Sequence, residues 1–457
     1  MSLEYDLIII GAGIVGCVAA VAFGKQGRKV LLIERDMSEP NRIVGEYLQP
    51  GGVVALEKLG LSECLENIDS IPCYGYGVFY GGETVSFLYP NVNGKPARGR
   101  SFHHGRFIMN LRNAASKISN VTICEAMAND IISCPLTERA LGVICTPKGE
   151  SDVRHFYAPL TIIADGCFSK FRKDFILRDV QVKSNFVGLI MKDAVLPYPN
   201  HGHVILANSP VLMYQIGTHE TRVLIDIPGK LPSNGSGELK KYIENNVLPF
   251  IPKSVQPSLY EALQTERLRS MPNSFLPPST NVNGGLIILG DAMNMRHPLT
   301  GGGMTVGFCD IVILSDLLSP AQTPDFNDTG LILAQLQVFH WKRKFYCSTV
   351  INVLAQALYS LVAAADDEYL RIMREACFNY FKFGGICINH PCGMLAGLFP
   401  NPLLLVFHFF AVAIYGVYRI FREDTILHIP QNILKSFIVI YTACVVILPV
   451  LWTELKF

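Results

Sequence analysis

A glycine-rich turn between a short strand and a helix constrains this fold more than any other feature. Residues Asp6–Ile10 form a hydrophobic run typical of a buried strand, and Gly11–Gly16 (GAGIVG) follows directly. A helical segment then extends to about Gly27, and a second strand, Lys29–Ile33, ends at Glu34. This order of strand, glycine turn, helix, strand and acid is the full context of a dinucleotide-binding fingerprint. This context makes it improbable that the segment is an ordinary strand–turn–helix that binds no nucleotide.

Each glycine of this turn has a separate expected role. Gly11 allows the sharp turn, Gly13 lets a pyrophosphate approach the backbone, and Gly16 lets helix and strand pack closely. Ile14 and Val15 lie between them, where the first backbone N–H groups of a helix attract an anion.

A second glycine-rich stretch lies much later in the chain. The run Leu286–Leu289 predicts a buried strand that ends at Gly290 and Asp291. Three glycines, Gly301–Gly303, then lead into a helix from Met304. Asp291 could accept a hydrogen bond from a ribitol or ribose hydroxyl, or the glycines could serve tight packing alone. The first fingerprint favours the nucleotide interpretation.

Two nucleotide-contacting loops this far apart in sequence indicate one long ligand, for which FAD is the natural candidate. A third motif, Ala164–Gly166, follows the strand Leu160–Ile163 and contains Asp165. The combination resembles the flavin monooxygenases of the aromatic-hydroxylase type. Longer stretches narrow the resemblance to the squalene monooxygenase (squalene epoxidase) family: Ile33–Gly52, Phe102–Arg112, Ala164–Lys173, Leu268–Ser279 and Gly290–Val306.

The resemblance implies an α/β fold in three parts. A Rossmann-type FAD-binding domain is interlocked with a β-sheet substrate domain, and a C-terminal helical region associates with the membrane. The expected FAD-binding domain comprises residues 1–70, 100–178 and 280–320. The substrate domain comprises 71–99 and 179–279, and the helical region is 321–457 with a membrane hairpin at 402–452.

The resemblance also implies which residues hold the cofactor. Arg42 corresponds to a flavin-contacting residue, Arg112 to the arginine that reaches the phosphates, and the backbone near Ala128 faces the adenine. Tyr47 stands where phenylalanine is commoner in the family. The expected set is Gly11, Gly13, Ile14, Val15, Gly16, Glu34, Arg35, Arg42, Tyr47, Arg112, Ala128, Asp165, Asp291, Gly302, Gly303 and Met304.

The reaction implied is epoxidation of squalene to 2,3-oxidosqualene in sterol biosynthesis, through a flavin C4a-hydroperoxide formed with O2. Epoxidation of an isolated alkene removes no substrate proton, so no general base is required. The sequence agrees, since it contains no G-x-S-x-G and no H-E-x-x-H. Tyr76 matches a family tyrosine that acts by hydrogen bonding, although a sheet tyrosine with its hydroxyl in water is the alternative.

The active site must be dry and apolar. The resemblance places Pro298, Leu299 and Met304 beside the flavin. It assigns the rest of the substrate pocket to Phe378, Phe381, Met394 and His408. His408 has the alternative of being an ordinary core histidine. Val362 replaces a common aromatic residue, which puts the shape of the pocket in question.

Two apolar runs near the end of the chain predict membrane association. Leu403–Tyr418 contains no charged residue, and Ile433–Trp452 is similar apart from Lys435. The first run reaches only ~24 Å as a helix, against a hydrocarbon core of ~30 Å. We therefore expect a monotopic hairpin in one leaflet; two true spans or buried core helices are the alternatives. The resemblance implies the cytosolic face of the endoplasmic reticulum.

Composition limits the possible partners. The net charge of +1 argues against nucleic acid. One complete dinucleotide fingerprint leaves no evident NADPH domain, so electrons are expected from outside, by resemblance from NADPH through the microsomal NADPH–cytochrome reductase. No metal site is expected. Cys387, His390 and Cys392 lack a second cluster, and the adjacent His103 and His104 point in opposite directions, which suits a structural role.

Two rival functions share this scaffold. A flavin-dependent isoprenoid reductase would saturate double bonds, and a non-catalytic prenyl-binding or lipid-binding escort protein would not use a flavin. Asp291, Arg112 and Glu34 argue against the escort protein, because all three belong to the expected flavin site.

Overall fold

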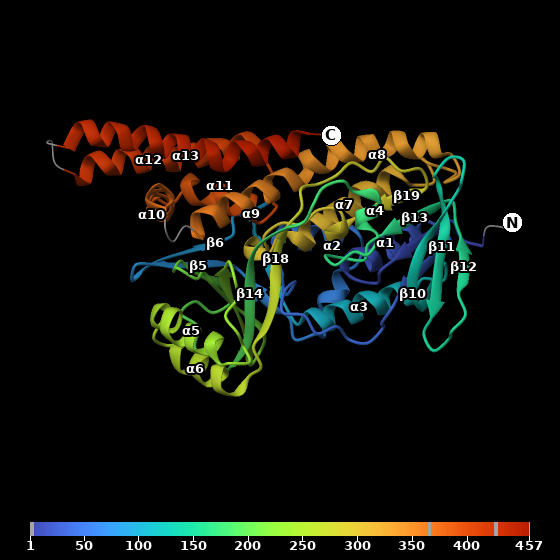
Figure 1. Ribbon diagram of the computed structural model, residues 1–457, viewed down its shortest axis with the longest axis horizontal. Coiled ribbons are helices and arrows are strands. Elements are labelled where there is room, and N and C mark those ends of the chain that lie inside the picture. Colours follow the sequence, from blue (N-terminus) through green and yellow to red (C-terminus); the bar gives the residue numbers. More distant parts are fainter. Residues whose placement is uncertain (1–3, 364–366, 425–427, 457) are drawn as a thin grey trace.

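The computed structural model describes residues 4–363, 367–424 and 428–456 (Figure 1). Two seven-stranded sheets and a layer of C-terminal helices make up the described fold, which confirms the predicted α/β architecture. The order of the first sheet is β12 (Arg154–Tyr157), β11 (Ala140–Pro147), β10 (Val121–Ser133), β2 (Val30–Glu34), β1 (Leu7–Ile10), β13 (Leu160–Ile163) and β19 (Leu286–Ile288).

The central strands of the first sheet are parallel. β1, an all-aliphatic and fully buried strand, pairs Leu7 with both Val30 of β2 and Leu160 of β13. β19 continues the parallel series beside β13. Because parallel strands end at the same edge, the three motifs that follow β1, β13 and β19 meet there. Three helices pack in the hydrophobic core of this domain: α1 (Ile14–Lys25), α3 (His104–Ser116) and α7 (Gly303–Leu317).

The second sheet is built from two separate parts of the chain. Its order is β18 (Arg269–Phe275), β14 (Gln181–Lys192), β17 (Glu220–Pro228), β16 (Val211–Gly217), β15 (His201–Ile205), β5 (Gly75–Tyr80) and β6 (Glu83–Leu88). Its neighbouring strands are antiparallel except β15 and β5, which are parallel. Helices α5 (Glu238–Asn246) and α6 (Gln256–Thr265) pack against it. The second β-sheet that the resemblance implies is therefore present.

Smaller elements connect the two sheets. They are β3 (Tyr47–Leu48), α2 (Pro50–Lys58), η1 (Ser62–Leu65), β4 (Ile71–Cys73), β7 (Asn91–Val92), β8 (Lys95–Pro96), β9 (Gly99–Ser101), α4 (Arg172–Phe175), η2 (Leu248–Phe250), η3 (Gly290–Ala292) and η4 (Pro298–Thr300).

The C-terminal helices form a layer along one side of the molecule. They are α8 (Thr329–Arg343), η5 (Lys344–Ser348), α9 (Thr349–Val362), α10 (Glu368–Lys382), α11 (Ile386–Leu395), α12 (Pro402–Glu423) and α13 (Ile429–Leu455). Figure 1 shows α12 and α13 side by side at the edge, extending beyond the two sheets, and an apolar cluster joins both to α9.

The predicted length of the first apolar helix is wrong. Asn401 caps α12, accepting hydrogen bonds from the N–H groups of Leu403 and Leu404, so Pro402 starts the helix. At the other end Arg419 pairs with Glu423 one turn on and continues the helix. The 22 residues of α12 reach ~33 Å rather than ~24 Å.

Three helices in the described part of the chain are long and apolar enough to cross a membrane: Thr329–Val362, Pro402–Glu423 and Ile429–Leu455. They differ in burial. The most apolar window of the first is 72% buried, against 28% and 17% for α12 and α13. The first therefore belongs to the protein core, whereas α12 and α13 expose the apolar surface that suits association with a membrane.

Candidate active site

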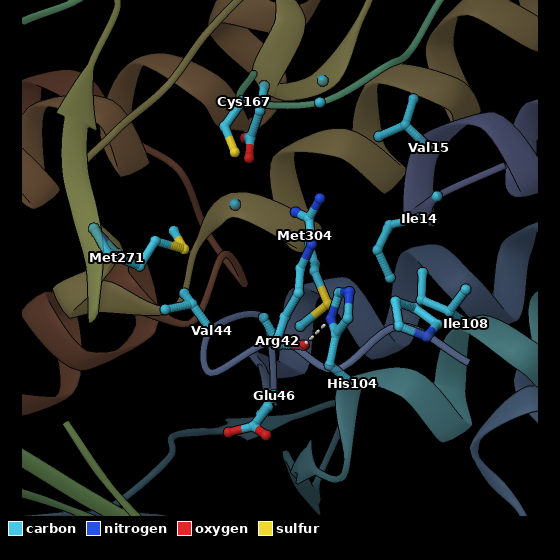
Figure 2. Close-up of a pocket in the computed structure, with 18 of the residues that line it drawn as sticks. Ile14, Val15, Arg42, Val44, Glu46, His104, Ile108, Cys167, Met271 and Met304 are labelled. Atoms are coloured by element: carbon cyan, nitrogen blue, oxygen red, sulfur yellow. Dashed lines mark hydrogen bonds between the residues drawn. The ribbon is translucent and has the colours of Figure 1, made fainter. Parts of the chain in front are cut away.

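A cavity of about 700 Å³ lies between the carboxyl edge of the first sheet and the second sheet. This volume falls in the usual range for small-molecule sites. Figure 2 shows Met271 and Val44 on one side of the cavity, Ile14 and Ile108 on the other, and Arg42 and Met304 between them. All sequence-predicted cofactor residues except Gly16 and Gly302 line this cavity.

The first glycine turn has the geometry expected of its sequence. Gly11 has a φ of +101°, and a Cβ there would lie 2.6 Å from the carbonyl oxygen of Ala164. A Cβ on Gly16 would lie 1.8 Å from the carbonyl oxygen of Gly11. A Cβ on Gly13, by contrast, would meet no atom within 4 Å, although Gly13 lines the cavity. The backbone at Gly13 therefore opens onto the cavity beside the N-terminus of α1.

Glu34 and Arg112 hold this turn in place from two sides. Glu34 Oε2 accepts a hydrogen bond of 2.8 Å from the N–H of Ala12. Arg112 Nε donates to the carbonyl oxygen of Ala12 at 3.0 Å, and its Nη1 donates to that of Ser38 at 2.9 Å. Arg112 Nη2 lies 3.8 Å from Glu34. These two predicted site residues thus form one unit with the glycine turn.

Arg172 joins the two later motifs, and our sequence reasoning missed its role. Its guanidinium donates to the carbonyl oxygens of Ala292 at 2.9 Å and Asp291 at 3.0 Å. It also donates to those of Gly166 at 3.2 Å and Cys167 at 2.8 Å. The available signal was its place in the conspicuous motif Ala164–Lys173, but only the fold shows which carbonyls it reaches.

Two carboxylates face the cavity from these motifs. Asp165 accepts a hydrogen bond of 3.0 Å from the N–H of Lys170, while its Oδ1 is buried with no protein partner. Burial raises the pKa of Asp165. Asp291 is an exposed residue that lines the cavity, and desolvation raises its pKa against the opposing effect of Arg296. Asp165 therefore keeps a buried acceptor oxygen without a protein partner, and Asp291 adds a second carboxylate to the lining of the cavity.

The loop before β3 closes the cavity on the side of the second sheet. Glu46, which our sequence reasoning also missed, pairs with Arg222 of β17 through two hydrogen bonds of 2.7 and 2.8 Å. His104 Nδ1 contacts the carbonyl oxygen of Gly45 at 2.9 Å, the dashed line of Figure 2. Burial lowers the pKa of His104 to about 4. A neutral His104 therefore donates to Gly45, in the structural role predicted for it.

A buried polar cluster surrounds Tyr76 on β5. Gln49 Nε2 donates to the Tyr76 hydroxyl and, at 2.6 Å, to the carbonyl oxygen of Thr300. Tyr89 donates to Gln49 Oε1 at 2.8 Å, and the hydroxyls of Tyr47 and Tyr89 lie 3.0 Å apart. The alternative of a sheet tyrosine with its hydroxyl in water is therefore wrong. Burial raises the pKa of Tyr76 to about 12.

The second glycine turn forms the apolar part of the wall. Pro298, Leu299 and Met304 line the cavity. Gly302 packs against α9, because a Cβ there would lie 2.4 Å from Ile351. Gly302 does not line the cavity, and its part in cofactor binding stays a prediction.

The four predicted pocket residues from the C-terminal helices do not line the cavity: Phe378, Phe381, Met394 and His408. They lie behind it. The ring of Phe381 is 5.9 Å from that of Phe87, which is in turn 6.0 Å from Tyr76. His408 is hydrogen-bonded to Tyr380 at 2.9 Å and to His390 at 3.0 Å. Their part in substrate binding stays a prediction.

Comparison with known proteins identifies the family. A model of the squalene epoxidase domain matches residues 157–434, and one of an NAD(P)-binding Rossmann-like domain matches residues 9–38. The chain is 51% identical to squalene epoxidase erg1 of Aspergillus fumigatus, with 98% of this chain and 93% of that protein aligned. It is 44% identical to squalene monooxygenase of Mus musculus, with 99% and 78% aligned. The chain belongs to the squalene epoxidase family.

Solved structures show how widely the fold of this squalene epoxidase family member is shared. The flavin-dependent brominase Bmp2 aligns with a TM-score of 0.71 at 14% identity, covering 92% of this chain and all of that one. The p-nitrophenol 4-monooxygenase PnpA from Pseudomonas putida DLL-E4 aligns with a TM-score of 0.70 at 14% identity, covering 88% and 100%. At this identity the likeness concerns the fold alone.

Proposed function

We propose that this chain is an FAD-dependent monooxygenase that epoxidises squalene to 2,3-oxidosqualene in sterol biosynthesis, using O2 and electrons from NADPH through a partner reductase. Two observations together carry the proposal. The chain is 51% and 47% identical to two squalene epoxidases over nearly its whole length, and its cavity joins a dinucleotide-binding edge to an apolar wall.

The cavity fits FAD on three observations. The open space at Gly13 leaves backbone and helix N-terminus free for a pyrophosphate. Asp165 has a buried oxygen without a protein partner, and Asp291 faces the cavity. The residues that would hold the cofactor are the predicted set, with Arg112 and Glu34 shaping the phosphate-binding turn. Bound FAD supplies the activation of O2, which protein side chains do not provide.

The residues of the chain orient the reactants and exclude water. Tyr76 keeps its proton at neutral pH because its pKa is about 12. Its oxygen accepts from Gln49, so its own hydrogen stays available as a donor beside the apolar wall. No group has to remove a substrate proton. The role that we assign to Tyr76 is therefore to orient the reactants through the hydrogen bond that its hydroxyl can donate.

Squalene needs a long apolar channel, which we assign to the space between the cavity and the C-terminal helices. Pro298 and Leu299 form its start, and Phe378, Phe381, Met394 and His408 form its continuation. The row of rings from Tyr76 through Phe87 to Phe381 supports this direction. We also propose the domain division given above, because residues 71–99 and 179–279 contain all seven strands of the second sheet and none of the first.

The cellular setting is part of the proposal. The exposed apolar surfaces of α12 and α13 support a monotopic attachment to the cytosolic face of the endoplasmic reticulum. There the enzyme would meet both a bilayer-borne substrate and an NADPH–cytochrome reductase as electron donor.

An absorbance spectrum of the purified protein, followed by incubation with squalene, O2, NADPH and a reductase, tests the function. We expect flavin bands and oxygen-dependent formation of 2,3-oxidosqualene. A colourless protein that takes up no FAD would support the lipid-binding escort alternative. Reduction of squalene under anaerobic conditions would support the isoprenoid reductase.

A further inference from the structure

Arg296 is a buried cation at the wall of the cavity. It lines the cavity and is 8% exposed. Its Nε donates to Asn352 Oδ1 at 2.7 Å, its Nη2 donates to Asn294 Oδ1 at 2.6 Å, and its Nη1 reaches the carbonyl oxygen of Gly303 at 3.4 Å. Its Nη2 also donates to the carbonyl oxygen of Asn294 at 3.1 Å. All of these acceptors are neutral, so the position of the guanidinium depends on how they are themselves held.

Asn352 of α9 is held by Glu454. The Nδ2 of Asn352 donates to Glu454 Oε1 at 2.9 Å and to Asn294 Oδ1 at 3.1 Å. Its Oδ1 is used by Arg296, so every polar atom of the amide is engaged. An amide with both ends committed cannot turn over without breaking a bond. Glu454 therefore sets which end of Asn352 faces Arg296.

Glu454 comes from a distant element. It lies at the C-terminal end of α13, is 1% exposed, and also accepts from Thr349 Oγ1 at 3.4 Å. The neighbouring buried carboxylate, Asp310, is already engaged by Arg343 through bonds of 2.9 and 2.8 Å. Glu454 is thus the carboxylate that accepts the hydrogen bond from Asn352.

We propose that Glu454 positions Arg296 at the flavin through Asn352. Helix α13 then contributes to cofactor binding, although none of its described residues lines the cavity. The inference rests on the proposed use of FAD. It makes Glu454 and Asn352 positioning residues and gives α13 a task besides membrane attachment.

The consequence for the flavin follows from charge. A fixed cation favours an electron-rich ligand, and reduced flavin carries more negative charge than oxidised flavin. Displacing Arg296 therefore weakens FAD binding and lowers the midpoint potential of the bound flavin. Loss of structural support alone would lower thermal stability without shifting the potential.

The test compares three substitutions at Glu454 with one control in α13. Glu454→Leu removes the acceptor, Glu454→Asp withdraws it by one methylene, and Glu454→Gln keeps an acceptor for Asn352. Ile447→Ala loosens a buried position of α13 that takes no part in the hydrogen bonds from Arg296 through Asn352 to Glu454. Each full-length protein is stripped of flavin and titrated with FAD, and its thermal stability and flavin midpoint potential are measured.

We expect the Kd for FAD to rise about tenfold in Glu454→Leu and about threefold in Glu454→Asp, with a lower midpoint potential in both. Glu454→Gln should stay within about twofold of the wild type. Ile447→Ala should lose thermal stability but keep both flavin properties. If Glu454→Leu does not fold, Glu454→Asp carries the test.

Wild-type affinity and potential in both Glu454→Leu and Glu454→Asp would overturn the inference. An equal loss of FAD affinity in Ile447→Ala would overturn it as well, because the effect would then follow stability. A wild-type protein that binds no FAD would overturn the proposed function itself, an outcome distinct from these two.

Discussion

Arg222 and Glu46 form a buried ion pair in which two parallel hydrogen bonds of 2.7 and 2.8 Å join the second sheet to the loop that closes the cavity. Arg222 is 5% exposed and Glu46 is 1% exposed. A bidentate arginine–carboxylate pair fixes orientation as well as distance. The pair therefore fixes the position of β17 relative to the wall beside Arg42 and Tyr47.

Removing one partner should destabilise the protein strongly. Glu46→Leu leaves the Arg222 charge buried without its carboxylate, and we expect a loss of about 3–5 kcal/mol in the free energy of unfolding. The double variant Glu46→Leu/Arg222→Met should regain at least half of that loss, because no charge stays uncompensated. Denaturant unfolding in detergent measures both. A Glu46→Leu variant as stable as the wild type would show that the ion pair is unimportant. A double variant no more stable than the single one would show that the uncompensated charge is not the cause of the loss.

Gly13 and Gly16 should respond differently to the same substitution. Gly16→Ala places a methyl group 1.8 Å from the carbonyl oxygen of Gly11, so we expect a poorly folded protein. Gly13→Ala meets no atom and should melt like the flavin-free wild type. Its methyl group nevertheless enters the cavity, and the Kd for FAD should rise at least tenfold. Thermal melts and FAD titration check both expectations. An unchanged Kd in Gly13→Ala would show that the pyrophosphate does not bind beside Gly13.

His104 should make stability depend on pH. The pKa of this histidine is about 4 in the folded protein, against an ordinary value of 6.5, because burial opposes its charged form. Its contribution is therefore fully present above pH 6.5 and is lost as the pH falls toward 4. The total is about 3 kcal/mol. Replacement with glutamine, which can still donate to Gly45, should flatten this slope. Parallel slopes in the two proteins would mean that the pKa of His104 does not change on folding.

Phe407 should contribute to membrane attachment. This residue of α12 is 59% exposed, and burying a phenylalanine side chain in lipid stabilises by about 1.5–3 kcal/mol. Phe407→Glu should weaken binding to lipid vesicles about tenfold or more and raise the apparent KM for vesicle-borne squalene. Phe250→Glu is the matched control, being 55% exposed in η2 between α5 and α6, far from α12 (Figure 1). Equal effects of the two substitutions would argue against α12 as the attachment site.

The elements that could be predicted are those whose signal is local. β1, β2, β13 and β19 lie within one or two residues of their predicted bounds, because each is a short aliphatic run ended by a glycine or an acid. The predicted hairpin begins at residue 402, as α12 does, but the C-terminal end of α12 was missed for a local reason too. Arg419, where the apolar run stops, gains a partner in Glu423 by continuing the helix.

The residues that could not be predicted depend on contacts between distant parts of the chain. Arg172 reaches carbonyls near Ala292, Gln49 bonds to Tyr76 and Thr300, and Glu46 pairs with Arg222. No periodicity marks such residues, since each partner is chosen by the topology of the two sheets. The family resemblance supplied the cavity-lining set, but not the polar groups that hold it in shape.

The parallel pairing of β1 with β13, and of β13 with β19, has a consequence for biosynthesis. The first glycine turn leaves the ribosome long before its companion strand β19, which ends at Ile288, and before the second turn, which ends at Gly303. Ile351 and Asn352, which back that second turn, emerge later still. The nascent chain must therefore hold the first turn without its companion strands until the segment through Asn352 has been made, and the cofactor site is complete only after that.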